Sequence, residues 1–176
     1  MRTQTLVQDY DFDIKNVKFN LDASIVNGKP NEALWTSSLI EGNNISEWVE
    51  FIKYEDFKIK PCLYILEPKD KVNLYYIDNM NDIESIPVLV DWKGNVTIDY
   101  KKLQRWGYDG VSLTSEGNCI IKSFRYYSGL SNSEDLFSLL MKMTTWDTES
   151  TVWFNTNWIK SFRLERDDLR DFELEY

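Results

Sequence analysis

Histidine is absent from this chain of 176 residues, and that absence is its most restrictive feature. Without histidine there is no Ser/His/Asp triad, no Cys/His dyad, no imidazole zinc ligand and no histidine general base. The two cysteines, Cys62 and Cys119, are too few for a disulfide framework and do not stand at a metal-ligand spacing, so we interpret them as buried thiols. Any chemistry must therefore come from carboxylates, hydroxyls, tyrosine, lysine or arginine.

Long apolar runs are also missing. No stretch reaches the roughly 20 residues that a membrane-spanning helix needs, and the chain does not open with a basic region followed by an apolar one. We therefore expect a cytoplasmic protein without membrane contact. Positive charge is scarce, because 20 Lys and Arg stand against 29 Asp and Glu, for a net charge of -9. This excess argues against free duplex DNA or RNA as the main partner, and favours a basic protein or a nucleotide held in a local positive cleft.

Aromatic residues, in contrast, are abundant. They make up 15% of the chain, with 7 Trp and 10 Tyr, and supply large side chains for a core or for stacking on a ligand. The length suits one domain, which we place at residues 1–164. Residues 165–176 form an acidic tail in which 6 of 12 residues are Asp or Glu.

The pattern of apolar residues predicts short strands interrupted by a few helices. Strands are expected within 3–10, 33–38, 63–66, 71–78, 88–90, 96–98, 108–113 and 119–124, and near the end of 146–154. Helices are expected after the caps Ser46, Asp99 and Ser133, the last one burying Phe137 among its leucines, and a short helix at 82–86. This order fits an α+β fold better than a doubly wound α/β fold.

Three segments in this order resemble one family. They are Leu34-Trp35-Thr36-Ser37-Ser38 with Glu47-Trp48-Val49-Glu50 after it, then residues 106–111, then Trp146-Asp147-Thr148-Glu149-Ser150-Thr151-Val152-Trp153. Together they are similar to segments of small phage and bacterial proteins whose fold resembles that of ADP-ribosyltransferases. The resemblance implies two small packed sheets flanked by helices, with NAD bound as a substrate in a cleft between them. A phage protein of this kind would act on a host target in the host cytoplasm.

The resemblance also implies which residues act. Breaking the bond between nicotinamide and ribose creates positive charge on the ribose, and a nearby carboxylate stabilises it. Glu149 matches the late glutamate of the family and would take this role with Ser37. Thr36 and Ser38 complete the hydroxyl strand, which would hold the ribose or orient the glutamate.

Other positions follow the family less closely. Trp35 would wall off the nicotinamide, and Asp147, two residues before Glu149, would contact the acceptor. The first strand of the family carries an Arg or His, but this chain has neither there. Gln8 or Tyr10 would have to replace it, with Arg2 as a further alternative.

Each candidate has a purely structural alternative. The hydroxyls of residues 36–38 could be satisfied by the backbone of an edge strand, and Glu149 could be a capping or salt-bridged carboxylate. Glu47 and Glu50 read as the solvated face of a helix. Three functions stay open: an enzyme that transfers ADP-ribose or hydrolyses NAD, a non-catalytic acidic phage inhibitor of a basic host site, and a nucleotide-binding protein without turnover.

Overall fold

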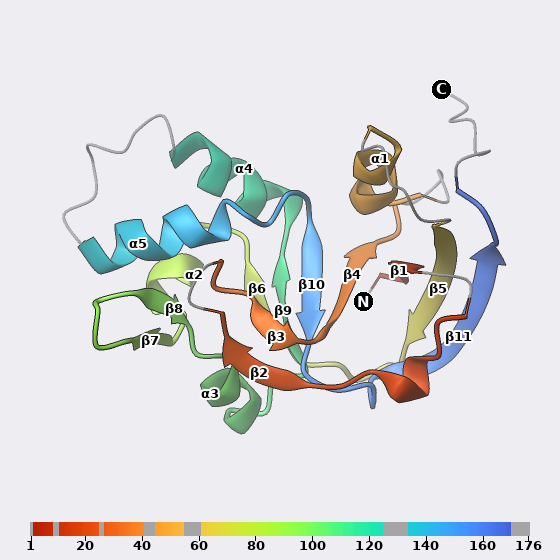
Figure 1. The fold of residues 1–176 in the computed structure, drawn as a ribbon, viewed down its shortest axis with the longest axis horizontal. Coiled ribbons are helices and arrows are strands. Elements are labelled where there is room, and N and C mark those ends of the chain that lie inside the picture. Colours follow the sequence, from red (N-terminus) through yellow and green to blue (C-terminus); the bar gives the residue numbers. More distant parts are fainter. Residues whose placement is uncertain are drawn as a thin grey trace.

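The chain folds into a seven-stranded sheet, two two-stranded sheets and helices, which is a mixed α+β arrangement (Figure 1). The computed structural model describes residues 2–8, 11–24, 27–40, 45–54, 61–124 and 134–169. The strands are β1 (Gln4–Gln8), β2 (Asn20–Ala23), β3 (Pro30–Glu32), β4 (Leu34–Ser38), β5 (Cys62–Pro68), β6 (Leu74–Ile77), β7 (Val88–Val90), β8 (Val96–Ile98), β9 (Gly110–Leu113), β10 (Ser150–Trp153) and β11 (Ile159–Arg166). The helices are a 3-10 turn at Ile14–Asn16, α1 (Glu47–Tyr54), α2 (Met80–Ser85), α3 (Tyr100–Arg105), α4 (Ser115–Phe124) and α5 (Glu134–Met143).

One strand, β4, joins the two halves of the large sheet. The strand order is β11-β5-β1-β4-β10-β9-β6, and only the β6–β9 pair is parallel. The last residues of β4 pair with β1 through Gln4↔Ser38 and Thr5↔Ser37, while its first residues pair with β10. The family resemblance implied two small packed sheets. Instead, one continuous sheet forms, because β4 is long enough to hydrogen-bond on both sides.

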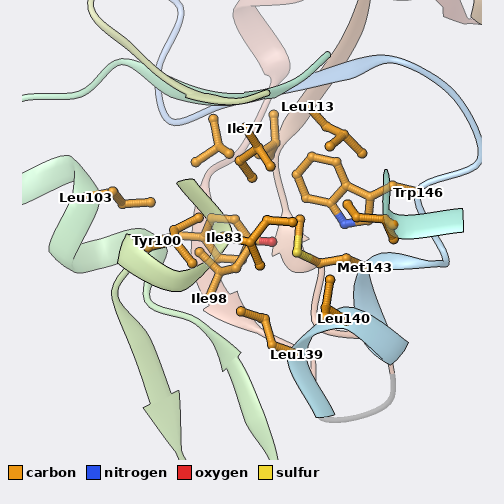
Figure 2. Close-up of a cluster of buried hydrophobic side chains, with 14 of the residues drawn as sticks. Ile77, Ile83, Ile98, Tyr100, Leu103, Leu113, Leu139, Leu140, Met143 and Trp146 are labelled. Carbon is orange, nitrogen blue, oxygen red and sulfur yellow. The ribbon is translucent and has the colours of Figure 1, made fainter. Parts of the chain in front are cut away.

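The larger core covers one face of the β10-β9-β6 half. Figure 2 shows Tyr100, Ile83 and Leu140 gathered with Met143 and Trp146 from α2, α3, α5 and the segment before β10. The β7–β8 hairpin adds Val96 and Ile98 to this cluster. The apolar positions recur every three or four residues in α5, as the sequence pattern predicted, and so meet the sheet on one side.

A second apolar cluster lies on the opposite face, toward β1 and β5. It contains Leu6, Leu34, Tyr64 and Leu66, together with Trp153, whose ring stacks on Trp158 at 3.6 Å. A smaller group packs α1 onto β5 and includes Val49, Leu63 and Leu169. Both faces of the sheet are thus largely covered, and polar residues inside it need hydrogen-bond partners.

Several predicted elements are confirmed at their ends. The side chain of Asp99 caps α3 by accepting from the backbone N of Lys102. Gly107 follows the helix with a φ of +88°, the left-handed conformation expected of a residue after a helix. The predicted cap Ser133 lies outside the described residues, as do the predicted strand residues 9 and 10.

Other predictions were wrong. Residues 119–124 form the end of helix α4 and not a strand, and Cys119 is exposed there, whereas Cys62 is buried as predicted. Three consecutive β-formers suggested a strand, but α4 buries Gly117 and Ile121, which are four residues apart on one helical face. Phe137, predicted in the buried stripe of α5, is 37% exposed, because it lies beside that stripe and not in it.

The segment assigned to an acidic tail is partly structured. β11 runs to Arg166, and Leu169 is buried against the α1 cluster, so the described part of the domain extends past residue 164. Residues 170–176 lie outside the described part. Within the described ranges, no helix combines the length and apolarity required to cross a bilayer.

Helix α4 approaches the sheet so closely that residue 117 must be glycine. A Cβ at this position would lie 2.0 Å from the backbone O of Ile77. We therefore expect Gly117→Ala to lower the free energy of unfolding by about 1–3 kcal/mol, although alanine favours a helix by up to about 1 kcal/mol. Urea denaturation measures the change. Cys119→Ala, an exposed position on the same helix, is the control; equal midpoints for the two variants would refute the close contact.

Candidate active site

A pocket of about 370 Å³ opens at one end of several neighbouring strands of the large sheet. It lies where β4, β6 and β9 end and β1 and β10 begin, next to the start of α4. The described residues that line it are Arg2, Gln4, Ser38, Leu74, Tyr76, Ser112, Thr114, Ser115, Glu116, Glu149 and Thr151. Two of the residues that sequence analysis singled out, Ser38 and Glu149, therefore share one pocket.

The Glu149 carboxylate is held by donors from β4. Its Oε2 accepts from Ser37 Oγ at 2.7 Å and from the backbone N of Ser38 at 2.8 Å, and its Oε1 accepts from Ser38 Oγ at 2.9 Å. Glu149 is 8% exposed. A carboxylate can accept about four hydrogen bonds, so one further donor can reach it from the pocket. The donors fix the orientation of the carboxylate, and Glu149 also lines the pocket.

Beneath this carboxylate lies a row of buried polar side chains. Thr36 Oγ1 donates to Gln4 Oε1 at 2.6 Å, and it accepts from Trp153 Nε1 at 2.7 Å. Gln4 Nε2 in turn donates to Ser38 Oγ at 3.1 Å. Because each of these groups is bonded to the next, Ser38 is oriented from below as well as by Glu149. Thr36 thus acts through Gln4 and is not among the residues that line the pocket.

Glu47, at the start of α1, fixes the backbone of Glu149. Its Oε2 accepts from the backbone N of Glu149 at 2.9 Å, and its Oε1 accepts from Ser115 Oγ. The sequence reading of Glu47 as part of a solvated helix face was therefore wrong. The first turn of α1 thus places the Glu47 carboxylate beside the start of β10, where it binds the backbone N–H of Glu149.

Burial raises the pKa of the Glu149 carboxyl above its ordinary value, and the nearby charge of Glu47 adds to the rise. Hydrogen bonds from Ser37 and Ser38 oppose it, because they favour the ionised form. The site thus combines a desolvated acid with donors that hold its anion in place. Perturbed acids in open pockets are typical of functional sites.

Three predicted site residues lie away from the pocket. Trp35 points to the opposite face of the sheet, where it packs edge-on against Trp146 at 4.8 Å with Lys29 Nζ 5.4 Å from its ring centre. Gln8 is exposed at the far end of β1 and pairs with Cys62. Asp147 is exposed, and its backbone O accepts from Lys122. The side-chain period of two along a strand explains Trp35, since its neighbours Leu34 and Thr36 occupy the other face.

Arg2, one of the alternatives to a first-strand Arg or His, is found at the pocket. It lies just before β1, lines the pocket, and its backbone O accepts from Gln4 Nε2 at 3.2 Å. Among the described lining residues it is the one with a basic side chain. Tyr10, the other alternative, lies outside the described residues.

Sequence reasoning missed several polar residues of the pocket floor, namely Gln4, Ser112 and Thr151. Two of them share a face with an apolar residue two positions away: Gln4 with Leu6, and Thr151 with Trp153. The sequence feature that could have identified them is a polar residue two positions before a buried apolar residue of the same strand. Only the strand pairing shows that these strand ends coincide, as in Thr151↔Thr36 and Thr151↔Ser112.

The described residues hold no group of three or more Asp, Glu or Cys side chains suited to a metal ion. No family model, no curated protein and no solved structure matches the chain.

The raised pKa of Glu149 predicts how stability depends on pH. The folded protein keeps the carboxyl proton to a higher pH than the unfolded chain, whose carboxyl titrates near 4.5. Between pH 4.5 and the raised pKa, the folded state binds more protons than the unfolded chain. The stability that the protonated Glu149 contributes is therefore lost as pH rises through this range. Urea titrations should show the stability of the wild type falling relative to Glu149→Gln over this range. Parallel pH curves for the two proteins would contradict the shift.

Proposed function

We propose that the pocket binds NAD and that the protein breaks the bond between nicotinamide and ribose, as an ADP-ribosyltransferase or an NAD hydrolase. The observation that carries the proposal is that Ser37 and Ser38 bind the carboxylate of Glu149, more than 100 residues later in the chain, beside an open pocket that Ser38 and Glu149 line. These are the residue types that the family resemblance requires. Their hydrogen bonds supply the geometry that the proposed chemistry needs.

The residues of the pocket fit parts of NAD. The volume of about 370 Å³ lies within the range typical of small-molecule sites. Ser38 and the free acceptor position of Glu149 suit ribose hydroxyls, the ring of Tyr76 offers a stacking surface, and Arg2 suits a phosphate. Because Arg2 is exposed, we place the phosphates at the rim and the nicotinamide ribose on the floor.

In this proposal Glu149 works by charge. NAD supplies a ribose on which positive charge develops as nicotinamide leaves, and the Glu149 carboxylate stabilises that charge at short range. Ser37 and Ser38 keep the carboxylate oriented and favour its ionised form. The buried contacts of Gln4 and Thr36 limit the movement of Ser38, so little reorganisation is needed during the reaction.

A second candidate is a non-catalytic protein that binds a basic host site. It is favoured by an exposed apolar strip on the β7–β8 hairpin, where Val90 is 54% and Trp92 is 88% exposed. Glu84 and Asp135 border a groove of about 270 Å³ beside this strip. Exposed aromatic and apolar residues near acids suit an interface with a basic partner.

Glu149→Gln separates catalysis from folding, because it removes the charge and keeps the side-chain volume. We expect this variant to release nicotinamide from NAD at least about 10²-fold more slowly than the wild type. Chromatographic detection of nicotinamide measures the rate. Glu32→Gln, an equivalent change on the exposed β3, should leave the rate unchanged. Equal rates for wild type and Glu149→Gln would exclude Glu149 as the catalytic residue.

NAD binding itself is tested by thermal unfolding. Binding to the folded state raises the melting temperature, and we expect NAD to do so for the wild type. Arg2→Ala should weaken the apparent affinity about tenfold, because it removes a charged hydrogen bond to phosphate. Gln8→Ala, at the other end of β1, should bind like the wild type. If NAD leaves the melting temperature of the wild type unchanged at millimolar concentration, the second candidate is favoured.

A further inference from the structure

Ser115 carries an exposed hydroxyl in the same pocket as Glu149. It is the first residue of α4, directly after the position that caps the helix. Here the residue before it, Thr114, does that work: its Oγ1 accepts from the backbone N of Gly117 at 3.2 Å, and its backbone O accepts from the N of Asn118 at 2.8 Å. The Ser115 side chain is therefore not needed to cap α4.

That side chain donates its proton to a carboxylate. Ser115 Oγ–H donates to Glu47 Oε1, a contact between residues 68 positions apart in the chain. The other oxygen of Glu47 accepts from the backbone N of Glu149 at 2.9 Å. Because both of its oxygens are engaged, the Glu47 carboxylate is fixed between the hydroxyl and the proposed catalytic acid. A hydroxyl bonded to an oriented carboxylate has the arrangement of a nucleophile with its base.

We propose that Ser115 is an acceptor hydroxyl, so that the protein ADP-ribosylates itself at this residue with Glu47 as the general base. The inference rests on the proposed function. Ser115 Oγ forms a bond to the ribose carbon that carries nicotinamide. The bond from that carbon to nicotinamide breaks, and nicotinamide leaves with the electron pair. The Ser115 proton passes to Glu47 Oε1, and from there to solvent.

Three other hydroxyls of the pocket lack a carboxylate that is free to act as a base, because the partner of Ser38 is Glu149, which the proposal uses to stabilise charge on the ribose. Ser38 Oγ donates to Glu149, and Thr151 Oγ1 donates to Ser112 Oγ at 3.0 Å. Thr114 Oγ1 donates to the backbone O of Ile77 at 3.2 Å, which cannot act as a base. Ser115 thus combines exposure, a place in the pocket and a carboxylate partner.

The test is incubation of the full chain with NAD, followed by mass spectrometry of the intact protein and of its peptides. We expect a mass gain of one ADP-ribosyl group, located at Ser115, and loss of this label in Ser115→Ala. Ser115→Thr should restore part of the label, because it retains a hydroxyl. Ser85→Ala, an exposed serine on α2 away from the pocket, should be labelled like the wild type.

Glu47→Gln tests the role of the base. Its amide oxygen can still accept from the Glu149 N–H, so the backbone stays in place, but it cannot take up the serine proton. We expect the label at Ser115 per nicotinamide released to fall about 10²-fold. A purely structural Glu47 would leave this ratio unchanged, which would overturn its role as base.

The outcomes separate the two proposals. Nicotinamide release by the wild type without label at Ser115 overturns the acceptor role and leaves the proposed function standing. No nicotinamide release overturns both. A measurement without NAD adds a second check: diisopropyl fluorophosphate should modify Ser115 in the wild type, and about 10²-fold more slowly in Glu47→Gln. Equal rates would show that Glu47 does not activate this hydroxyl.

Discussion

The contact on which the rest of the site depends is the junction between Glu149 and the end of β4. A carboxylate removed from water costs free energy unless donors replace its hydration. Ser37 and Ser38 provide these donors, and they do so only because β10 enters the sheet beside β4 in the register Thr151↔Thr36. The strand pairing therefore decides whether the acid is satisfied. Glu47 completes the junction from the helical side by binding the N–H of Glu149.

The two apolar clusters explain why the polar row beneath the pocket stays ordered. Trp153 contributes its ring to the apolar cluster and its N–H to Thr36, so one side chain links the core to the site. Thr36 passes this constraint to Gln4, and Gln4 passes it to Ser38. A network in which each member is bonded to the next tends to hold a single arrangement. Rigidity in the core is thus transmitted to the carboxylate at the edge of the sheet.

Much of the local structure could be predicted, and the errors have physical causes. Asp99 and Gly107 act within a few residues of their own helix, so their roles are readable from neighbours in the chain. Residues 119–124 misled because strand propensity is weak, and the packing of Gly117 against Ile77 outweighed it. The prediction for Glu47 was wrong because its partners lie far along the chain. An acid in the first turn of a helix is commonly solvated, and only the return of the chain at Glu149 gives it partners.

The sequence by itself determined what chemistry is possible: a chain without histidine must work with carboxylates and hydroxyls, and its apolar periodicity required a mixed α+β fold. The hydroxyl strand and the late glutamate were also visible as separate segments. The tertiary structure alone decided that they meet, that Arg2 and not Gln8 lies beside them, and that Trp35 faces away. The reason is that strand register and side-chain alternation act between segments far apart in the chain, and no local pattern encodes which strand ends coincide.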